Sequence, residues 1–175
     1  MKKNNILFTF ILSTFFLSLT IVLPYLTGQI PEIGSMLCPM HIPVLMCGFI
    51  CGWKYGLLIG LIAPIFRSLI LGMPPLFPQA FCMSFELATY GMISGLMYNI
   101  LPKKTIYIFI SLIIAMLSGR LVWGCTMFCC MAFDLTKFSL TSFWIGGFAN
   151  SLPGIIIQII LVPIFIIAYN KLVKK

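Results

Sequence analysis

Acidic residues are scarce in this chain: only three Asp or Glu occur among 175 residues, beside eleven Lys or Arg. Charged residues of both signs make up 8% of the sequence, hydrophobic residues make up 61%, and mean hydropathy is +1.14. A soluble domain of this length could not cover its surface with so few charges. The composition therefore indicates a polytopic membrane protein without an additional soluble domain.

The net charge of +8 would favour a nucleic-acid partner if it lay on a soluble surface. Here the charges separate apolar stretches, which is the pattern that orients a membrane protein. We therefore expect membrane lipid as a partner and no nucleic acid.

Residue types that serve catalysis or metal binding are also few. One histidine and three carboxylates provide no HExxH motif, no paired aspartates in adjacent spans and no Gly-x-Ser-x-Gly motif. A Walker-type Gly-rich lysine loop is lacking, which excludes that route to ATP hydrolysis. Seven cysteines occur without CxxC or Cys/His metal spacing, which favours small buried apolar residues over a disulfide framework or a metal site. We expect no enzyme activity and no cofactor.

Long apolar runs predict an all-α polytopic membrane protein, with residues 1–175 in a single membrane domain. They predict six transmembrane helices, at about 6–26, 41–53, 55–72, 79–101, 105–133 and 143–170. The first run is interpreted as a retained span because no Ala-x-Ala-like cleavage site follows it. The second and third runs are short, and one long helix carrying Lys54 is the alternative.

Basic residues near both ends predict the orientation. They are Lys2, Lys3, Lys171, Lys174 and Lys175. The positive-inside rule then places both termini in the cytoplasm, which requires an even number of crossings. Six crossings also place Lys54, Lys103 and Lys104 in the cytoplasm.

Three charged side chains, Arg67, Glu86 and Arg120, interrupt apolar runs at nearly one depth. Counted from the nearest lysine anchors they lie 13, 17 and 16 residues away, which is roughly 20–26 Å at the rise of an α-helix. Charge at that depth usually marks a functional site. The functional interpretation is a solute pocket in the outer half of the membrane, where a guanidinium binds a carboxylate or phosphate. The structural alternative is an Arg–Glu–Arg network that pins three helices.

Other side chains extend this predicted pocket. Tyr90 lies one turn after Glu86, and Trp123 lies three residues after Arg120, so each shares a helix face with a charged neighbour. Asn150 stands near the outer end of the last apolar run. His41 stands at the entrance of the second apolar run, where it either binds the solute or serves as a structural group. Gln158 is assigned to a helix–helix hydrogen bond. The predicted substrate-binding set is His41, Arg67, Glu86, Tyr90, Arg120, Trp123 and Asn150.

Small residues also recur at four-residue spacing, which lets helices approach closely. The glycines with this spacing are Gly48, Gly52, Gly56, Gly60, Gly91 and Gly95, and we assign them to packing within the chain. Thr14 and Ser18 form a small notch on a first run crowded with Phe and Leu. The spacing leaves open whether the helix that docks there belongs to this chain or to another subunit.

A specific series of residues runs through the middle of the chain: His41-Ile42-Pro43, Gly48, Gly52, Tyr55-Gly56-Leu57, Gly60, Pro64, Gly72-Met73-Pro74-Pro75, Phe85-Glu86-Leu87 and Tyr90-Gly91. With this series the chain resembles the substrate-binding S component of an energy-coupling factor (ECF) vitamin transporter, in the broad riboflavin, folate and pantothenate group. The resemblance covers nearly the whole length. It implies a solute site in the outer half of a bacterial plasma-membrane protein.

The same resemblance implies a transmembrane T subunit and two ATPase subunits as partners, and a subunit that tips in the membrane to release its solute inside. An Ala-x-x-x-Ala motif on the family's first helix docks on the T subunit. The matching positions here are Thr14 and Ser18, which are small but not alanine.

The charged residues leave several solutes open. Two arginines near one carboxylate favour an anionic or zwitterionic micronutrient, with pantothenate as the first candidate, while Glu86 suits a vitamin B6 amine, thiamine or a queuine-like base. Two other functions remain as alternatives: an ion-coupled secondary carrier or channel with Glu86 as the proton site, and a purely structural membrane subunit.

Overall fold

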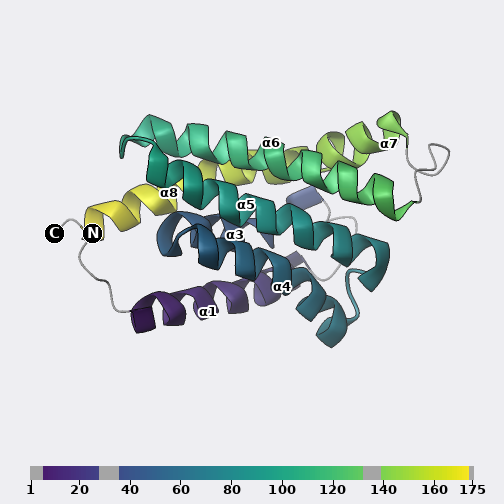
Figure 1. Cartoon of the computed structure of the whole chain (residues 1–175), viewed down its shortest axis with the longest axis horizontal. Helices are drawn as coiled ribbons and strands as arrows, with labels where there is room; N and C mark the ends of the chain where they lie inside the picture. Colours follow the sequence, from purple (N-terminus) through teal and green to yellow (C-terminus); the bar gives the residue numbers. More distant parts are fainter. Residues whose placement is uncertain (1–5, 28–35, 132–138, 174–175) are drawn as a thin grey trace.

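Helices make up nearly all of the computed structural model, which describes residues 6–27, 36–131 and 139–173 (Figure 1). The α-helices are α1 Ile6–Val22, α3 His41–Cys51, α4 Trp53–Leu71, α5 Phe81–Ile100, α6 Thr105–Cys130, α7 Leu140–Trp144 and α8 Leu152–Val173. Short turns of other helical types precede α5, follow α1 and join α7 to α8, at Leu76–Ala80, Leu23–Thr27 and Ile145–Ala149. Within these ranges no strand occurs, as the sequence predicted.

Five helices in the described ranges are long and apolar enough to cross a membrane. They are Ile6–Tyr25, Trp53–Leu71, Leu76–Ile100, Thr105–Cys130 and Leu152–Leu172. The second predicted span corresponds to α3, whose 11 residues reach about half way through a bilayer core. The last predicted span is divided, because α7 and the turn after it occupy its first part and the long helix α8 begins only at Leu152. The chain is therefore multi-pass, with α3 as a short apolar helix among longer ones.

A single glycine separates α3 from α4. Gly52 has φ of +95°, a backbone conformation that L side chains rarely adopt, and the helix ends there. The sequence predicted two helices with a break at Trp53-Lys54-Tyr55, and the structure places the break just before it. The alternative of one long helix through Lys54 is wrong.

Close backbone packing joins α3, α4 and α5. A Cβ atom on Gly91 of α5 would collide with the backbone of Gly56 on α4, and one on Gly60 would collide with the backbone of Leu87. The small-residue spacing therefore serves packing within the chain, as expected. This contact fixes the position of α5, which carries Glu86 and Tyr90.

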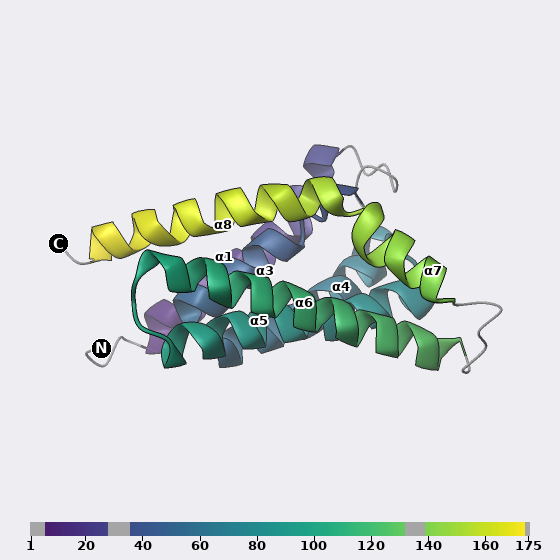
Figure 2. The ribbon, with the colours of Figure 1, turned by 90° about the horizontal axis from the view of Figure 1, so that it is seen from above.

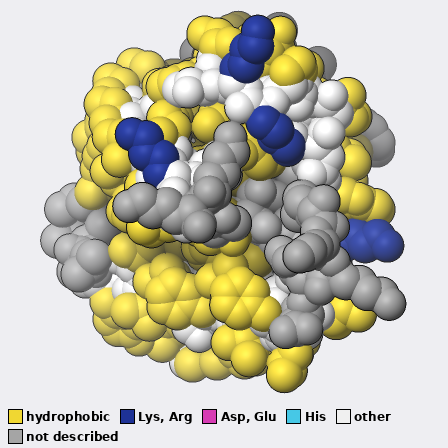
Figure 3. All heavy atoms as spheres, turned by 90° about the vertical axis from the view of Figure 1, so that its left-hand side faces the viewer, with side chains coloured by type: hydrophobic (Ala, Val, Ile, Leu, Met, Phe, Trp, Pro, Cys, Tyr) yellow, Lys and Arg dark blue, Asp and Glu magenta, His cyan; other side chains and the backbone are white. Residues whose placement is uncertain are grey.

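The described lysines gather at one end of the molecule, here called the lysine end. Lys54 begins α4, Lys103 and Lys104 connect α5 to α6, and Lys171 lies in the last turn of α8. Figures 1 and 3 show these connections and basic side chains on the same face. The start of α1 lies at this end too, whereas α7 meets the start of α8 at the opposite end (Figure 2). The described lysines thus distinguish the two ends of the bundle.

We predict that Gly91→Ala destabilises the protein by about 1–3 kcal/mol, because only backbone atoms of α4 stand in the way and they cannot rotate aside. Thermal unfolding in detergent measures the effect. Leu58→Ala is the control, since Leu58 lies on the same pair of helices with its side chain half exposed. Equal midpoints for the two variants would contradict a rigid α4–α5 contact.

Candidate functional site

A layer of polar residues lies directly above the apolar core. Leu45, Tyr90, Met116 and Val162 belong to one buried core cluster, each from a different helix. One helical turn farther from the lysine end on each helix stands a polar residue, because residues four apart share a helix face. These residues are His41 on α3, Glu86 on α5, Arg120 on α6 and Gln158 on α8, and all four are buried. We call them the polar layer.

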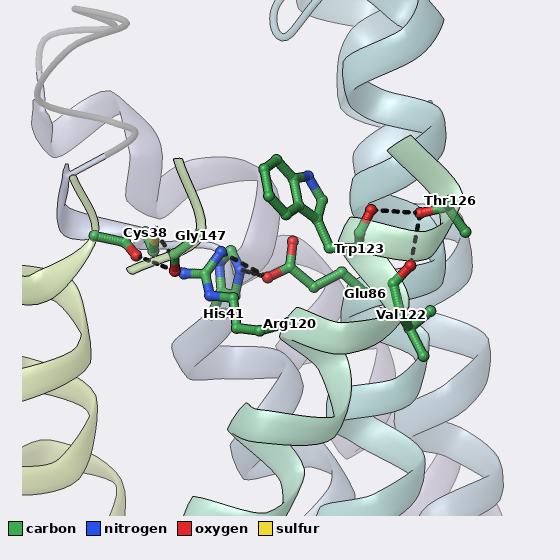
Figure 4. A network of polar contacts seen from close by, with 9 residues as sticks. Cys38, His41, Glu86, Arg120, Val122, Trp123, Thr126 and Gly147 are labelled. Carbon is green, nitrogen blue, oxygen red and sulfur yellow. Dashed lines mark hydrogen bonds and ion pairs between the residues drawn. The ribbon is translucent and has the colours of Figure 1, made fainter. Parts of the chain in front are cut away.

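An ion pair lies at the centre of the polar layer. Arg120 Nη1 lies 2.8 Å from Glu86 Oε1, and His41 Nε2 lies 3.5 Å from the same oxygen. Figure 4 shows the three side chains converging from α6, α5 and α3. Glu86 is 1% exposed and Arg120 is 6% exposed. An ion pair buried so deeply is stable only when good geometry and further polar contacts surround it.

Tyr90 forms the floor beneath this pair. Its ring centroid lies 5.2 Å from that of His41, and its side chain is fully buried. Gly119 of α6 makes room for the ring, since a Cβ atom at that position would overlap it. The absence of a side chain at Gly119 therefore lets α5 and α6 approach beside the ion pair.

The segment Met36–Met40 lies over the polar layer. Arg120 Nη2 contacts Cys38 Sγ at 3.8 Å, and the backbone of this segment packs on α8, where a Cβ atom at Gly154 would lie 2.7 Å from the Leu37 oxygen. The segment therefore links α8 to the ion pair on α6. Sulfur is a weak acceptor, so the Cys38 contact satisfies little of the hydrogen-bonding capacity of the guanidinium.

Arg67 lies apart from the central pair. Its Nη1 donates to Met40 Sδ at 3.4 Å, and its side chain is 7% exposed. Among the described residues the ion pairs of Glu86 are with Arg120 and His41, and none involves Arg67. The segment Met36–Met40 thus contacts both arginines, each through a sulfur atom.

An aromatic wall stands at the end of the bundle away from the lysines. Trp123, three residues after Arg120 on α6, stacks on Phe143, with ring centroids 6.2 Å apart and planes inclined by 25°. Phe148 packs against Phe143 at 5.8 Å. The side chain of Asn150 is exposed, while its backbone N–H donates to the Ile145 oxygen at 2.9 Å. The wall therefore combines a predicted residue, Trp123, with two phenylalanines that the sequence reasoning missed.

Several buried polar atoms in and around the layer form no hydrogen bond within the described part of the chain. They are Nδ1 of His41, the Nε atoms of Arg67 and Arg120, and both amide atoms of Gln158. Leaving a buried donor or acceptor unpaired costs about 1–3 kcal/mol. So many such atoms in one region are typical of a site that serves a polar guest.

The described residues hold no group of three or more His, Cys, Asp or Glu that could bind a metal ion. Gln158, assigned to a helix–helix hydrogen bond from the sequence, has no such bond among the described residues. Its depth from the lysines was the available clue that it belongs to the polar layer. Glu32 and Asp134, the two acidic residues besides Glu86, lie outside the described ranges.

Thr14 and Ser18 lie on the exposed face of α1. The Thr14 hydroxyl donates to the Ile11 oxygen at 2.8 Å, and Ser18 donates to the Thr14 oxygen at 3.1 Å. Because both hydroxyls bond to their own helix, they leave a small, apolar notch. No other described helix covers that notch, since both side chains are exposed.

A double-mutant cycle tests the central ion pair. We predict that Glu86→Leu and Arg120→Met each destabilise the protein by about 3–5 kcal/mol, because each leaves one buried charge without its partner. The double variant is expected to regain most of this loss, since no buried charge remains. Unfolding in detergent provides the measurement, and additive losses would show that the two side chains do not interact.

The chain is similar to one family of known proteins. A family model described as the substrate-specific component of ECF transporters matches residues 8–166, almost the whole chain. No curated protein and no solved structure matches the chain. Members of this family are substrate-binding transporter subunits rather than enzymes, which agrees with the multi-pass architecture. The chain belongs to the family of substrate-specific S components of ECF transporters.

Proposed function

We propose that this subunit captures a vitamin-sized micronutrient in the polar layer and passes it to an ATP-driven ECF module. The observation that carries this proposal is the set of unpaired buried donors and acceptors around the Glu86–Arg120 pair. A purely structural clamp gains nothing from such atoms, because each one lowers stability. A solute that bonds to these atoms removes that cost, and this makes binding of the solute more favourable.

The arrangement of charge supports a zwitterionic or uncharged, hydrogen-bonding solute over a simple anion. Glu86 already neutralises Arg120, so the buried layer has no large excess of positive charge. His41 and Gln158 both present atoms that can donate or accept. Trp123 and Phe143 would contact an apolar or flat part of the same molecule.

Among named solutes, pantothenate remains the first to test, because it has hydrogen-bonding groups besides its carboxylate. Its carboxylate would have to reach Arg67 or compete with Glu86 for Arg120. Thiamine and a vitamin B6 amine, which would turn a cationic group toward Glu86, are the natural comparison compounds.

We propose six crossings with both termini in the cytoplasm. The lysine end is then cytoplasmic under the positive-inside rule, and the polar layer lies in the outer half of the bilayer. The short helix α3 counts as a crossing that starts at the depth of the polar layer, with Met36–Met40 lying above it. Irregular backbone at that depth is tolerated because protein surrounds it.

The proposed partners are a transmembrane T subunit and two ATPase subunits, in the plasma membrane of a bacterium. The notch at Thr14 and Ser18 supports a docking role for α1, because its exposed face is small and apolar where the rest of the helix is bulky. Helices in lipid associate best through such small residues.

Removing one polar group separates a binding role from a structural one. We predict that Gln158→Leu lowers affinity at least tenfold, or about 1.4 kcal/mol, for the small molecule that mass spectrometry identifies in the purified protein. The thermal midpoint without added solute should stay equal or rise, because the Gln158 amide forms no hydrogen bond with the described residues. Tyr90→Phe should lower affinity as well, since the Tyr90 hydroxyl lies beside the Glu86 carboxylate.

Leu121→Ala is the matched control, since Leu121 follows Arg120 on α6 but is 61% exposed. Calorimetry with pantothenate, thiamine and pyridoxamine covers the named candidates. Unchanged affinity in both Tyr90→Phe and Gln158→Leu would reject the polar layer as the solute site.

Orientation is tested by fusions at the C-terminus. We predict that a fused green fluorescent protein is fluorescent and a fused alkaline phosphatase is inactive, because the end of α8 lies in the cytoplasm. The same fusions after Gly72, in the α4–α5 connection, should give the opposite pattern. Active phosphatase at the C-terminus would contradict the six-crossing arrangement.

A further inference from the structure

Two cysteines from helices distant in the sequence meet at the end of the bundle opposite the lysines. Cys82 is the second residue of α5, and Cys130 is the last residue of α6. Their sulfur atoms lie 3.7 Å apart, within contact distance. Cys125 and Cys129, in the same last turns of α6, are exposed. Of these three cysteines, Cys130 is the one whose sulfur contacts Cys82 in the described part of the chain.

The pair sits directly above the polar layer. Cys82 lies one turn before Glu86 on α5, and Thr126 lies one turn before Cys130 on α6. Under the orientation proposed above, this end of the bundle is external, where thiols meet an oxidising environment. Cys82 is fully buried, whereas Cys130 is half buried at a helix end and can be reached from outside.

We propose that Cys82 and Cys130 are a redox modification site that closes to a disulfide, joining the outer ends of α5 and α6. A disulfide needs the sulfurs about 2.0 Å apart, so they must approach by less than 2 Å. Cys130 is the more adjustable partner, because no further helical turn follows it on α6.

The chemistry needs an external two-electron oxidant, and a small disulfide such as oxidised glutathione is sufficient. Cys130 loses its proton to solvent and its thiolate attacks one sulfur of the small disulfide, which releases one small thiolate and leaves a mixed disulfide. Cys82 then loses its proton and attacks the Cys130 sulfur, which releases the second small thiolate. The two protons end on the two released thiols, so two cysteine thiols are oxidised and one small disulfide is reduced.

The cross-link would act on the site through helix spacing. The Glu86–Arg120 pair joins the same two helices. Glu86 lies one turn from Cys82 on α5, and Arg120 lies nearly three turns from Cys130 on α6. A disulfide would therefore limit separation of α5 and α6 beside the polar layer. It would also restrict the unfolded chain, so the oxidised form should unfold at a higher temperature than the reduced form.

Peptide mapping of the oxidised protein tests the proposal without any solute. Trypsin releases residues 68–103, in which Cys82 is the only cysteine, and residues 121–137, which hold the other three outer cysteines. After treatment of the detergent-purified full chain with oxidised glutathione, we expect these peptides to be joined. Denaturing maleimide labelling should give two fewer adducts than the seven cysteines allow. Dithiothreitol should reverse both results.

Matched serine variants identify the cysteine on α6. Cys125→Ser and Cys129→Ser should keep the joined peptides, and Cys130→Ser should lose them. Separate peptides in the oxidised wild type would overturn the proposal, as would a link that persists in Cys130→Ser. The wild-type result needs no variant to fold, and it is independent of solute binding by the polar layer.

Discussion

The buried pair between Glu86 and Arg120 is the interaction on which the half of the bundle away from the lysines depends. Two charges at this depth cannot be solvated by lipid, so each requires the other at hydrogen-bonding distance. That requirement sets how α5 and α6 pack: Gly119 carries no side chain, and the Tyr90 ring occupies the space beneath the pair. His41 can reach Glu86 because α3 begins at the level of the polar layer.

A rigid support and a short covering segment lie on opposite sides of this pair. On the lysine side, glycine contacts lock α4 and α5 backbone to backbone, which holds Glu86 and Tyr90 in fixed positions. On the other side, Met36–Met40 contacts Arg67 and Arg120 through sulfur atoms, and Met40 packs into the buried core. The ion pair is therefore enclosed from both sides by packed parts of the chain.

Much of this could be predicted from the sequence because a helix has a constant rise. Counting residues from the lysines placed Glu86 and Arg120 at one depth, and the structure joins them to each other and to His41. Arg67 shares the depth but lacks an ion pair among the described residues, because depth does not give the direction in which a side chain points. Residues 139–149 carry Phe143 and Phe148, and no spacing rule relates them to Trp123 across a connecting segment. The break between α3 and α4 was displaced for a similar reason: a charge such as Lys54 marks a helix end only approximately, whereas Gly52 sets it through its backbone conformation.

Gln158 illustrates how a buried polar group should be judged in a membrane protein. From sequence alone, a glutamine in an apolar helix is best assigned to a neighbouring helix, since lipid offers no partner. In the fold its amide is buried one turn above Val162, in register with His41 and Arg120, and it forms no hydrogen bond with described residues. An amide held in this way lowers stability unless something else bonds to it. A leucine at this position would leave no such atoms unpaired, and for that reason the amide supports the proposal that the polar layer binds a solute.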